Sequence, residues 1–182
     1  MTRQNKNILL LVLIGVLTYT AYDYNFKLNE APSTLEVNEC TFAELELERF
    51  MQDVAFSESS NRHDIVSRYG YLGKYQFSQK TLRSLGYKIS KKEFLSNPIV
   101  QDEAMIDLLK SNKEFLQKYI NKWDGKKYNG IKVTESGILA AAHLTGATSV
   151  KKFFTEGVNK KDANGTSIVD YMTKFADYKF EI

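Results

Sequence analysis

A glutamate followed by a loop rich in aromatic and polar residues is the part of the chain best suited to chemistry. Glu58 closes a stretch with helical periodicity, and a Gly- and Tyr-rich segment after it ends at Gln76. Cleavage of a glycosidic bond needs an acid that protonates the leaving oxygen. A carboxyl group at the end of a helix, facing aromatic and amide side chains, meets this need. The residues therefore predict that Glu58 lies in a groove for a sugar chain.

The position of Glu58 also bears on its protonation. The C-terminus of a helix carries a partial negative charge, which disfavours an ionised carboxylate there. Partial burial would act in the same direction, because desolvation disfavours the charged form. We therefore expect Glu58 to act as a proton donor. Asp64, six residues on, is the candidate for a second carboxylate nearby, although its place in the loop suits a polar turn better.

The elements that position this glutamate are predicted to be mainly α-helices. Apolar residues recur at helical spacing from Phe42 to Phe56, and Thr41 can cap that helix. Capping residues and helix-ending glycines predict further helices at 78–85, 134–146 and 149–155. Another helix is expected to begin at a capping box at 90–93, and the longest runs from Pro98 to Trp123. The last runs from Thr166 or Ser167 to Phe175. We expect residues 126–132 to form a basic turn.

The tyrosines after Glu58 suggest the one extended segment. Tyr69, Tyr71 and Tyr75 alternate with other residues along this segment, and Gly70 and Gly73 interrupt it. This pattern permits either a short β-hairpin or an extended loop beside the groove.

The N-terminal region is predicted to direct export. Residues 1–7 are polar and basic, and residues 8–17 are nearly all aliphatic. This order is typical of a signal peptide or an N-terminal membrane anchor, here over residues 1–22. The run is shorter than the roughly 20 residues that span a bilayer comfortably, and a clean cleavage site is missing, so both alternatives stay open. A linker at 23–40 would then lead to an exported domain at 41–182, in the periplasm or cell envelope, anchored or secreted.

Composition excludes several classes of protein. The formal charge is +3, but residues 1–22 hold two of the positive charges and no acid, so the remainder carries +1. There is thus no electrostatic case for a nucleic-acid partner. One cysteine permits no intramolecular disulfide, and with two histidines it argues against a zinc site. Asp162 and Asn164 suit a turn better than a calcium loop, so we expect no metal.

Four short motifs occur in a fixed order along the chain. They are Glu58-Ser59, Gly73-Lys74-Tyr75-Gln76-Phe77, Ala141-Ala142-His143-Leu144-Thr145-Gly146, and residues 167–175. This order resembles the catalytic domain of the lytic transglycosylases and goose-type lysozymes, within the lysozyme-like superfamily. The resemblance covers roughly Thr41 to Phe175 and implies a globular, mainly helical, lysozyme-like domain with an active-site groove.

The resemblance also implies roles for individual residues. Glu58 would be the single catalytic acid and base, and Ser59 would orient its carboxyl group by a hydrogen bond. Tyr75 and Gln76 would line the groove that holds the N-acetyl sugars. Tyr171 would reach back toward Glu58.

Other candidates for contact with substrate are Tyr69 and His143. Packing explains Tyr69 equally well, and the apolar helix around His143 is more typical of a hydrogen-bonded residue of the core or rim. The sequence also departs from the family pattern. Ser60 stands where the first motif usually has glycine, and His143 and Leu144 stand where the third usually has Tyr-Asn.

The resemblance implies a bacterial enzyme that cleaves the β-1,4 bond between N-acetylmuramic acid and N-acetylglucosamine in peptidoglycan. In a transglycosylase the sugar's own 6-hydroxyl attacks, which gives a 1,6-anhydro product without a second carboxylate or a cofactor. One alternative is a hydrolytic lysozyme (muramidase) that uses Asp64 as its base. Another is a non-catalytic module of the same fold that binds peptidoglycan or scaffolds a wall machine. The expected partners are peptidoglycan strands and, through the N-terminus, the membrane or envelope, with the chain acting as a monomer.

Overall fold

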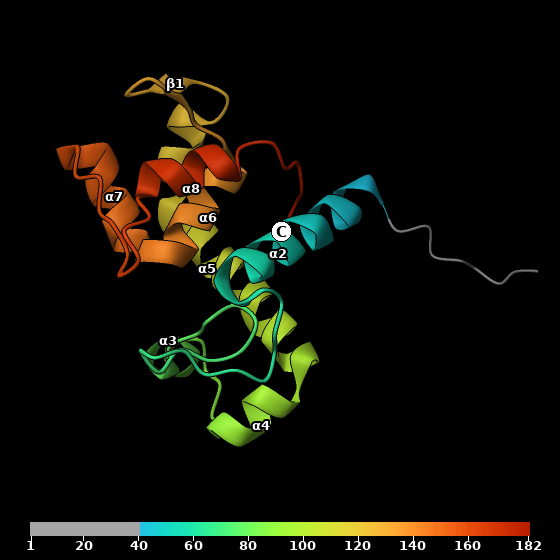
Figure 1. Ribbon diagram of the computed structural model, residues 1–182. Helices are drawn as coiled ribbons and strands as arrows, with labels where there is room; N and C mark the ends of the chain where they lie inside the picture. The colour runs from blue at the N-terminus through green and yellow to red at the C-terminus, as the bar shows by residue number, and fades with distance from the viewer. Residues whose placement is uncertain (1–40) are drawn as a thin grey trace, which may run out of the picture. The chain divides into compact units, whose positions relative to one another are not determined.

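A computed structural model describes residues 41–182, which fold mainly into helices as the sequence predicts (Figure 1). The elements are α2 (Phe42–Ser59), α3 (Gln79–Ser84), α4 (Lys91–Ser96), α5 (Pro98–Trp123), β1 (Lys127–Tyr128), β2 (Ile131–Lys132), α6 (Glu135–Thr145), α7 (Ala147–Glu156) and α8 (Ile168–Lys174). The signal or anchor segment predicted at 1–22 and the linker at 23–40 lie outside the described residues. Within 41–182, no helix is both long and apolar enough to cross a membrane.

The helix starts follow the predicted caps. Thr41, Ser90 and Ser167 each form a capping box, in which the cap side chain and the acid three residues later bond to each other's backbone amides. Ser78 and Thr134 cap α3 and α6 with their hydroxyl groups. These reciprocal bonds satisfy amide groups that a helix start otherwise leaves unpaired.

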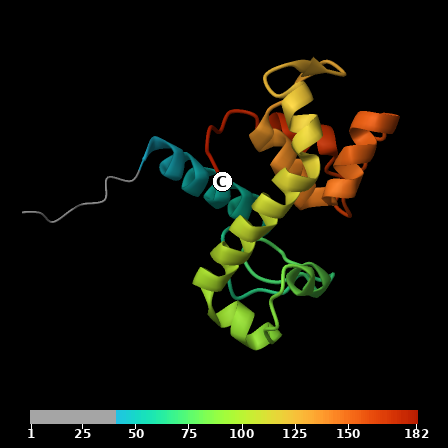
Figure 2. The same cartoon turned by 180° about the vertical axis from the view of Figure 1, so that it is seen from behind.

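The longest helix, α5, joins the two ends of the domain. It begins with Pro98 after the Asn97 cap, and it buries Met105, Leu109 and Leu116 completely. Figure 2 shows α5 running from the part of the domain that holds α3 and α4 to the part that holds α6, α7 and α8. It is therefore the common support of the loop after α2 and of the C-terminal helices.

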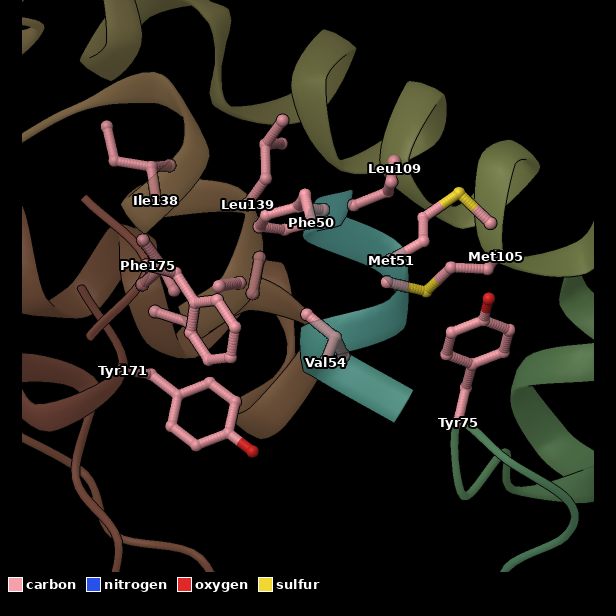
Figure 3. Packing of buried hydrophobic residues seen from close by; sticks show 14 of the residues in the cluster. Phe50, Met51, Val54, Tyr75, Met105, Leu109, Ile138, Leu139, Tyr171 and Phe175 are labelled. Atoms are coloured by element: carbon pink, nitrogen blue, oxygen red, sulfur yellow. The ribbon is translucent and has the colours of Figure 1, made fainter. Parts of the chain in front are cut away.

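Helix α6 is the central element of the C-terminal half. Residues 136–142 are all buried, and α6 packs against α5, α7 and α8. A Cβ atom on Gly137 would lie 2.6 Å from the carbonyl oxygen of Met172, so the close crossing of α6 and α8 requires glycine there. Figure 3 shows Ile138 and Leu139 of α6 with Phe50 of α2 in the core.

The β-hairpin lies elsewhere than the tyrosine pattern suggested. Residues 127–132, predicted as a basic turn, form the antiparallel pair β1–β2. Asn129 and Gly130 both have positive φ, the geometry that an Asn-Gly hairpin turn requires. The segment after Glu58 is instead an extended loop, held by isolated bridges of Leu72 to Val66 and Phe77. The hairpin residues line neither of the two cavities described below.

Candidate active site

The end of α2 brings Glu58 to Tyr171 of α8. Ser60 takes a left-handed conformation (φ 56°) that ends α2, so Glu58 lies in its last turn. Tyr171 Oη donates a hydrogen bond of 2.6 Å to Glu58 Oε1, across 113 residues of sequence. Glu58 is half-buried. The predicted approach of Tyr171 to Glu58 is therefore present.

Burial keeps Tyr171 a hydrogen-bond donor. The residue is 6% exposed, and its ring packs on Phe175, with a centroid distance of 5.2 Å. In Figure 3 the hydroxyl group of Tyr171 points away from Phe175. Burial, and then the charge of Glu58, raise the pKa of Tyr171 well above its ordinary value. The phenol therefore stays protonated across the physiological pH range.

Glu58 lies where two cavities meet. We call the first, of about 530 Å³, the serine cavity; it is lined by Ser57, Glu58, Ser59, Ser60, Arg62, Ile65, Val66, Ser67 and Gln76. We call the second, of about 560 Å³, the tyrosine cavity, because Tyr69, Tyr71, Phe77 and His143 are among the residues that line it. Glu58, Ser67 and Gln76 line both. A polymer that passes Glu58 would thus find room in two cavities that share this residue.

Gln76 is held at this junction by its own turn. Its φ of 53° is unusual for a residue with a side chain, and its Nε2 donates a hydrogen bond of 2.8 Å to Gly73 O. A strained backbone of this kind costs on the order of 1 kcal/mol and persists only where the surroundings enforce it. The turn and its hydrogen bond hold the Gln76 amide group among the residues that line both cavities, as Glu58 does. This position is the one expected for a residue of the groove.

Ser59 does not orient the Glu58 carboxyl group, contrary to the prediction. Ser59 Oγ lies 2.9 Å from Lys74 O and 3.2 Å from Ala55 O, and it accepts a hydrogen bond from the Arg62 amide. Neighbouring residues on a helix point in different directions, and Ser59 points into the protein, where it is 6% exposed. Its role is to fasten the end of α2 to the loop after it.

Tyr75 does not line the groove either. It is 2% exposed, and its hydroxyl group donates a 2.5 Å hydrogen bond to Asp102 of α5. Lys74 Nζ reaches the same carboxylate at 2.7 Å. Burial, and then the bond to Asp102, raise the pKa of Tyr75 above its usual range. Figure 3 shows Tyr75 beside Met105, so this side chain anchors the loop on α5 while Gln76 faces the cavities.

Gln101 is a second anchor of this loop, and the sequence reasoning missed it. The side chain is fully buried; its Oε1 accepts from the Lys74 amide at 2.8 Å, and its Nε2 donates to His63 O at 3.0 Å and Phe94 O at 2.8 Å. The signal that could have found it is an amide side chain on the apolar face of α5, a face that also holds Asn112. Buried amides persist when they satisfy backbone groups that have no other partner.

The predicted second carboxylate lies outside the site. Asp64 is exposed and lines neither cavity. Asp162 lines the tyrosine cavity together with Glu58, but its Oδ1 accepts hydrogen bonds from the amides of Asn164 (3.0 Å) and Thr166 (2.7 Å). It therefore forms the predicted turn. Over residues 41–182, no group of three His, Cys, Asp or Glu residues could hold a metal ion.

His143 and Tyr69 both line the tyrosine cavity. Tyr69 is 51% exposed, which leaves its ring available to a ligand. The centroids of the His143 and Phe77 rings lie 6.0 Å apart in an edge-to-face arrangement. Its Nδ1 is buried and finds no hydrogen-bond partner in the described part of the chain. Burial lowers the pKa of His143 and outweighs the opposing effect of the Glu58 charge, so the imidazole is neutral at pH 7.

Comparisons of the chain with protein-family models, with curated proteins and with solved structures gave no match. What the protein does must therefore be inferred from its motifs and from the site itself.

Proposed function

We propose that this protein is a peptidoglycan lytic transglycosylase with a lysozyme-like fold. The observation that carries the proposal is the hydrogen bond from Tyr171 to Glu58 at the junction of the serine and tyrosine cavities. One carboxyl group, held at a defined position and lining two cavities with room for a glycan, is the minimum that cleavage within a sugar chain requires.

The proposed reaction uses Glu58 twice. The Glu58 carboxyl group first protonates the oxygen that leaves with N-acetylglucosamine, while the N-acetyl group of the muramic acid stabilises the positive centre. The 6-hydroxyl of the same muramic acid then attacks the positively charged carbon from which the oxygen has left, and Glu58 takes the proton of the hydroxyl. The new C–O bond replaces the broken one, the acid is restored, and no water is consumed.

The surroundings of Glu58 favour this route over hydrolysis. Hydrolysis by the usual routes needs a second carboxylate as base or nucleophile. Asp64 lines neither cavity, and backbone amides already occupy Asp162. The exposed rings of Tyr69 and Tyr71 would offer apolar surface to the sugar faces.

Zymography on peptidoglycan tests this proposal. We expect the wild-type protein to clear the gel and Glu58→Gln to abolish clearing, because an amide group is too weak an acid to protonate the leaving oxygen, while its carbonyl oxygen can still accept the Tyr171 hydrogen bond. Glu48→Gln is the matched control, since it makes the same change at an exposed position of α2. No clearing by the folded wild-type protein would contradict catalysis and favour the non-catalytic binding module.

A further inference from the structure

Three cationic side chains line the same cavity as Glu58. Arg68 belongs to the loop after α2, and Lys160 and Lys161 belong to the loop between α7 and α8. All three are exposed, yet two have defined positions. The Arg68 guanidinium lies 4.6 Å from the centre of the Tyr69 ring, and Lys160 Nζ donates to Thr145 O at 3.4 Å and Ser149 Oγ at 3.3 Å. The charges of Arg68 and Lys160 are thus held at the tyrosine cavity.

The two carboxylates that line the tyrosine cavity, Glu58 and Asp162, form no ion pair with these three cations. Glu58 accepts from Tyr171, and Asp162 accepts from backbone amides. Elsewhere in residues 41–182, ion pairs form between Arg49 and Glu46, Lys74 and Asp102, Lys113 and Glu135, and Lys132 and Asp177. Among the described residues, none of the three cavity cations has a carboxylate within ion-pair distance. A cavity lined by such cations attracts anionic ligands.

We infer that Arg68, Lys160 and Lys161 recognise carboxylates on the substituents of muramic acid. The inference rests on the proposed function, because it takes peptidoglycan as the substrate. A chain of N-acetylglucosamine alone is neutral, whereas muramic acid carries a lactyl group that ends in a carboxylate or in a peptide bearing carboxylates. The three cations would therefore select peptidoglycan over neutral N-acetylglucosamine polymers.

Equilibrium binding to a protein that cannot cleave tests this inference apart from catalysis. The parent is full-length Glu58→Gln, and the test variant adds Arg68→Gln, Lys160→Gln and Lys161→Gln. The charge-matched control adds Lys118→Gln, Lys151→Gln and Lys152→Gln instead, at exposed positions that line neither cavity. Circular dichroism first checks that all three proteins are folded.

Four soluble ligands of equal glycan length serve as probes. They are a peptide-bearing glycan, a peptide-free glycan with free lactyl carboxylates, the same peptide-free glycan with its carboxylates amidated, and an N-acetylglucosamine oligomer. We expect the test variant to lose about tenfold in affinity for carboxylate-bearing glycan, since three exposed charge pairs are individually weak. The amidated and N-acetylglucosamine ligands should bind parent and test variant alike. The control should match the parent throughout.

The pattern of losses identifies the source of the carboxylate. A loss with the peptide-free glycan points to the lactyl group, and a loss confined to the peptide-bearing glycan points to the stem peptide. Either result supports the inference, and 0.5 M salt should weaken that binding through screening. Equal affinities of parent and test variant for every ligand, an equal loss in the control, or no binding by the parent would overturn it. If the wild-type protein fails to clear a zymogram but its binding still depends on Arg68, Lys160 and Lys161, only the proposed enzyme activity is overturned.

Discussion

The amide group of Gln101 occupies the space that a side chain on Gly73 would need. A Cβ atom built on Gly73 would lie 2.2 Å from Gln101 Oε1, and Gly73 has a φ of +70°. Gln101 in turn holds the backbone of Lys74, and the next residues in the chain are Tyr75 and Gln76. Gly73 thus leaves room for the Gln101 side chain, which holds the loop beside Glu58 in place.

We predict that Gly73→Ala lowers the free energy of unfolding by about 2–4 kcal/mol, because it adds backbone strain and displaces a buried, hydrogen-bonded amide. Urea denaturation measures the loss. Gly70→Ala is the control: its φ is +82°, but nothing lies within 4 Å of its added Cβ, so only the strain of about 1 kcal/mol applies. Equal losses for the two variants would show that Gln101 does not restrain Gly73.

Tyr171→Phe isolates the hydrogen bond to Glu58. The ring that packs on Phe175 remains, so we expect a midpoint of thermal unfolding close to that of the wild type. We expect kcat on peptidoglycan to fall by about 10- to 100-fold, because a catalytic group held slightly out of place loses rate steeply. Turbidity clearing at several substrate concentrations separates kcat from KM.

The control for that variant is Tyr178→Phe. Tyr178 Oη donates a 2.5 Å hydrogen bond to Asp53, also on α2, and Tyr178 lines neither cavity. Removal of this phenol should leave kcat unchanged. A Tyr171→Phe enzyme with wild-type kcat would contradict a positioning role for Tyr171.

His143 should make the fold less stable in mild acid. Burial lowers its pKa in the folded protein, so below the unfolded value of about 6.5 the unfolded chain binds a proton that the folded chain does not. Stability is therefore lost as pH falls below about 6.5, by at most about 1.4 kcal/mol per pH unit for this one group.

The comparison of two histidine variants isolates this effect. His143→Gln cannot take the proton, so its unfolding free energy should fall less between pH 7.5 and pH 5.5 than that of the wild type. His63→Gln, at the other and exposed histidine, should follow the wild type. A wild-type pH dependence in His143→Gln would show that the imidazole does not titrate differently on folding.

Sequence patterns predict the helices well because caps and apolar periodicity are local. Thr41, Ser78, Ser90, Thr134 and Ser167 cap the helices that they were expected to cap. The β1–β2 hairpin was predicted as a turn, although Asn129-Gly130 carries a hairpin signal between short strands. Two-residue strands are too short for period-two alternation to indicate them.

The site was predictable only in part, because side-chain direction depends on tertiary packing. The pairing of Glu58 with Tyr171 was expected only from the family resemblance, and the hydrogen bond between them is present. Ser59 and Tyr75 were assigned to the site, but each faces a partner that lies far away in sequence, Lys74 O and Asp102 respectively. An amide on the apolar face of α5 is a local signal that Gln101 is buried, but its three partners are backbone groups of other segments, which no local pattern identifies.

Digestion of purified peptidoglycan in ¹⁸O-labelled water, followed by mass spectrometry of the products, tests the central claim most directly. If Glu58 accepts the proton of the sugar's own 6-hydroxyl as that hydroxyl attacks, the wild-type protein should release 1,6-anhydro-muropeptides that contain no ¹⁸O. The Glu58→Gln variant should release no muropeptides. Reducing ends that carry ¹⁸O from the water would contradict the account and establish hydrolysis instead.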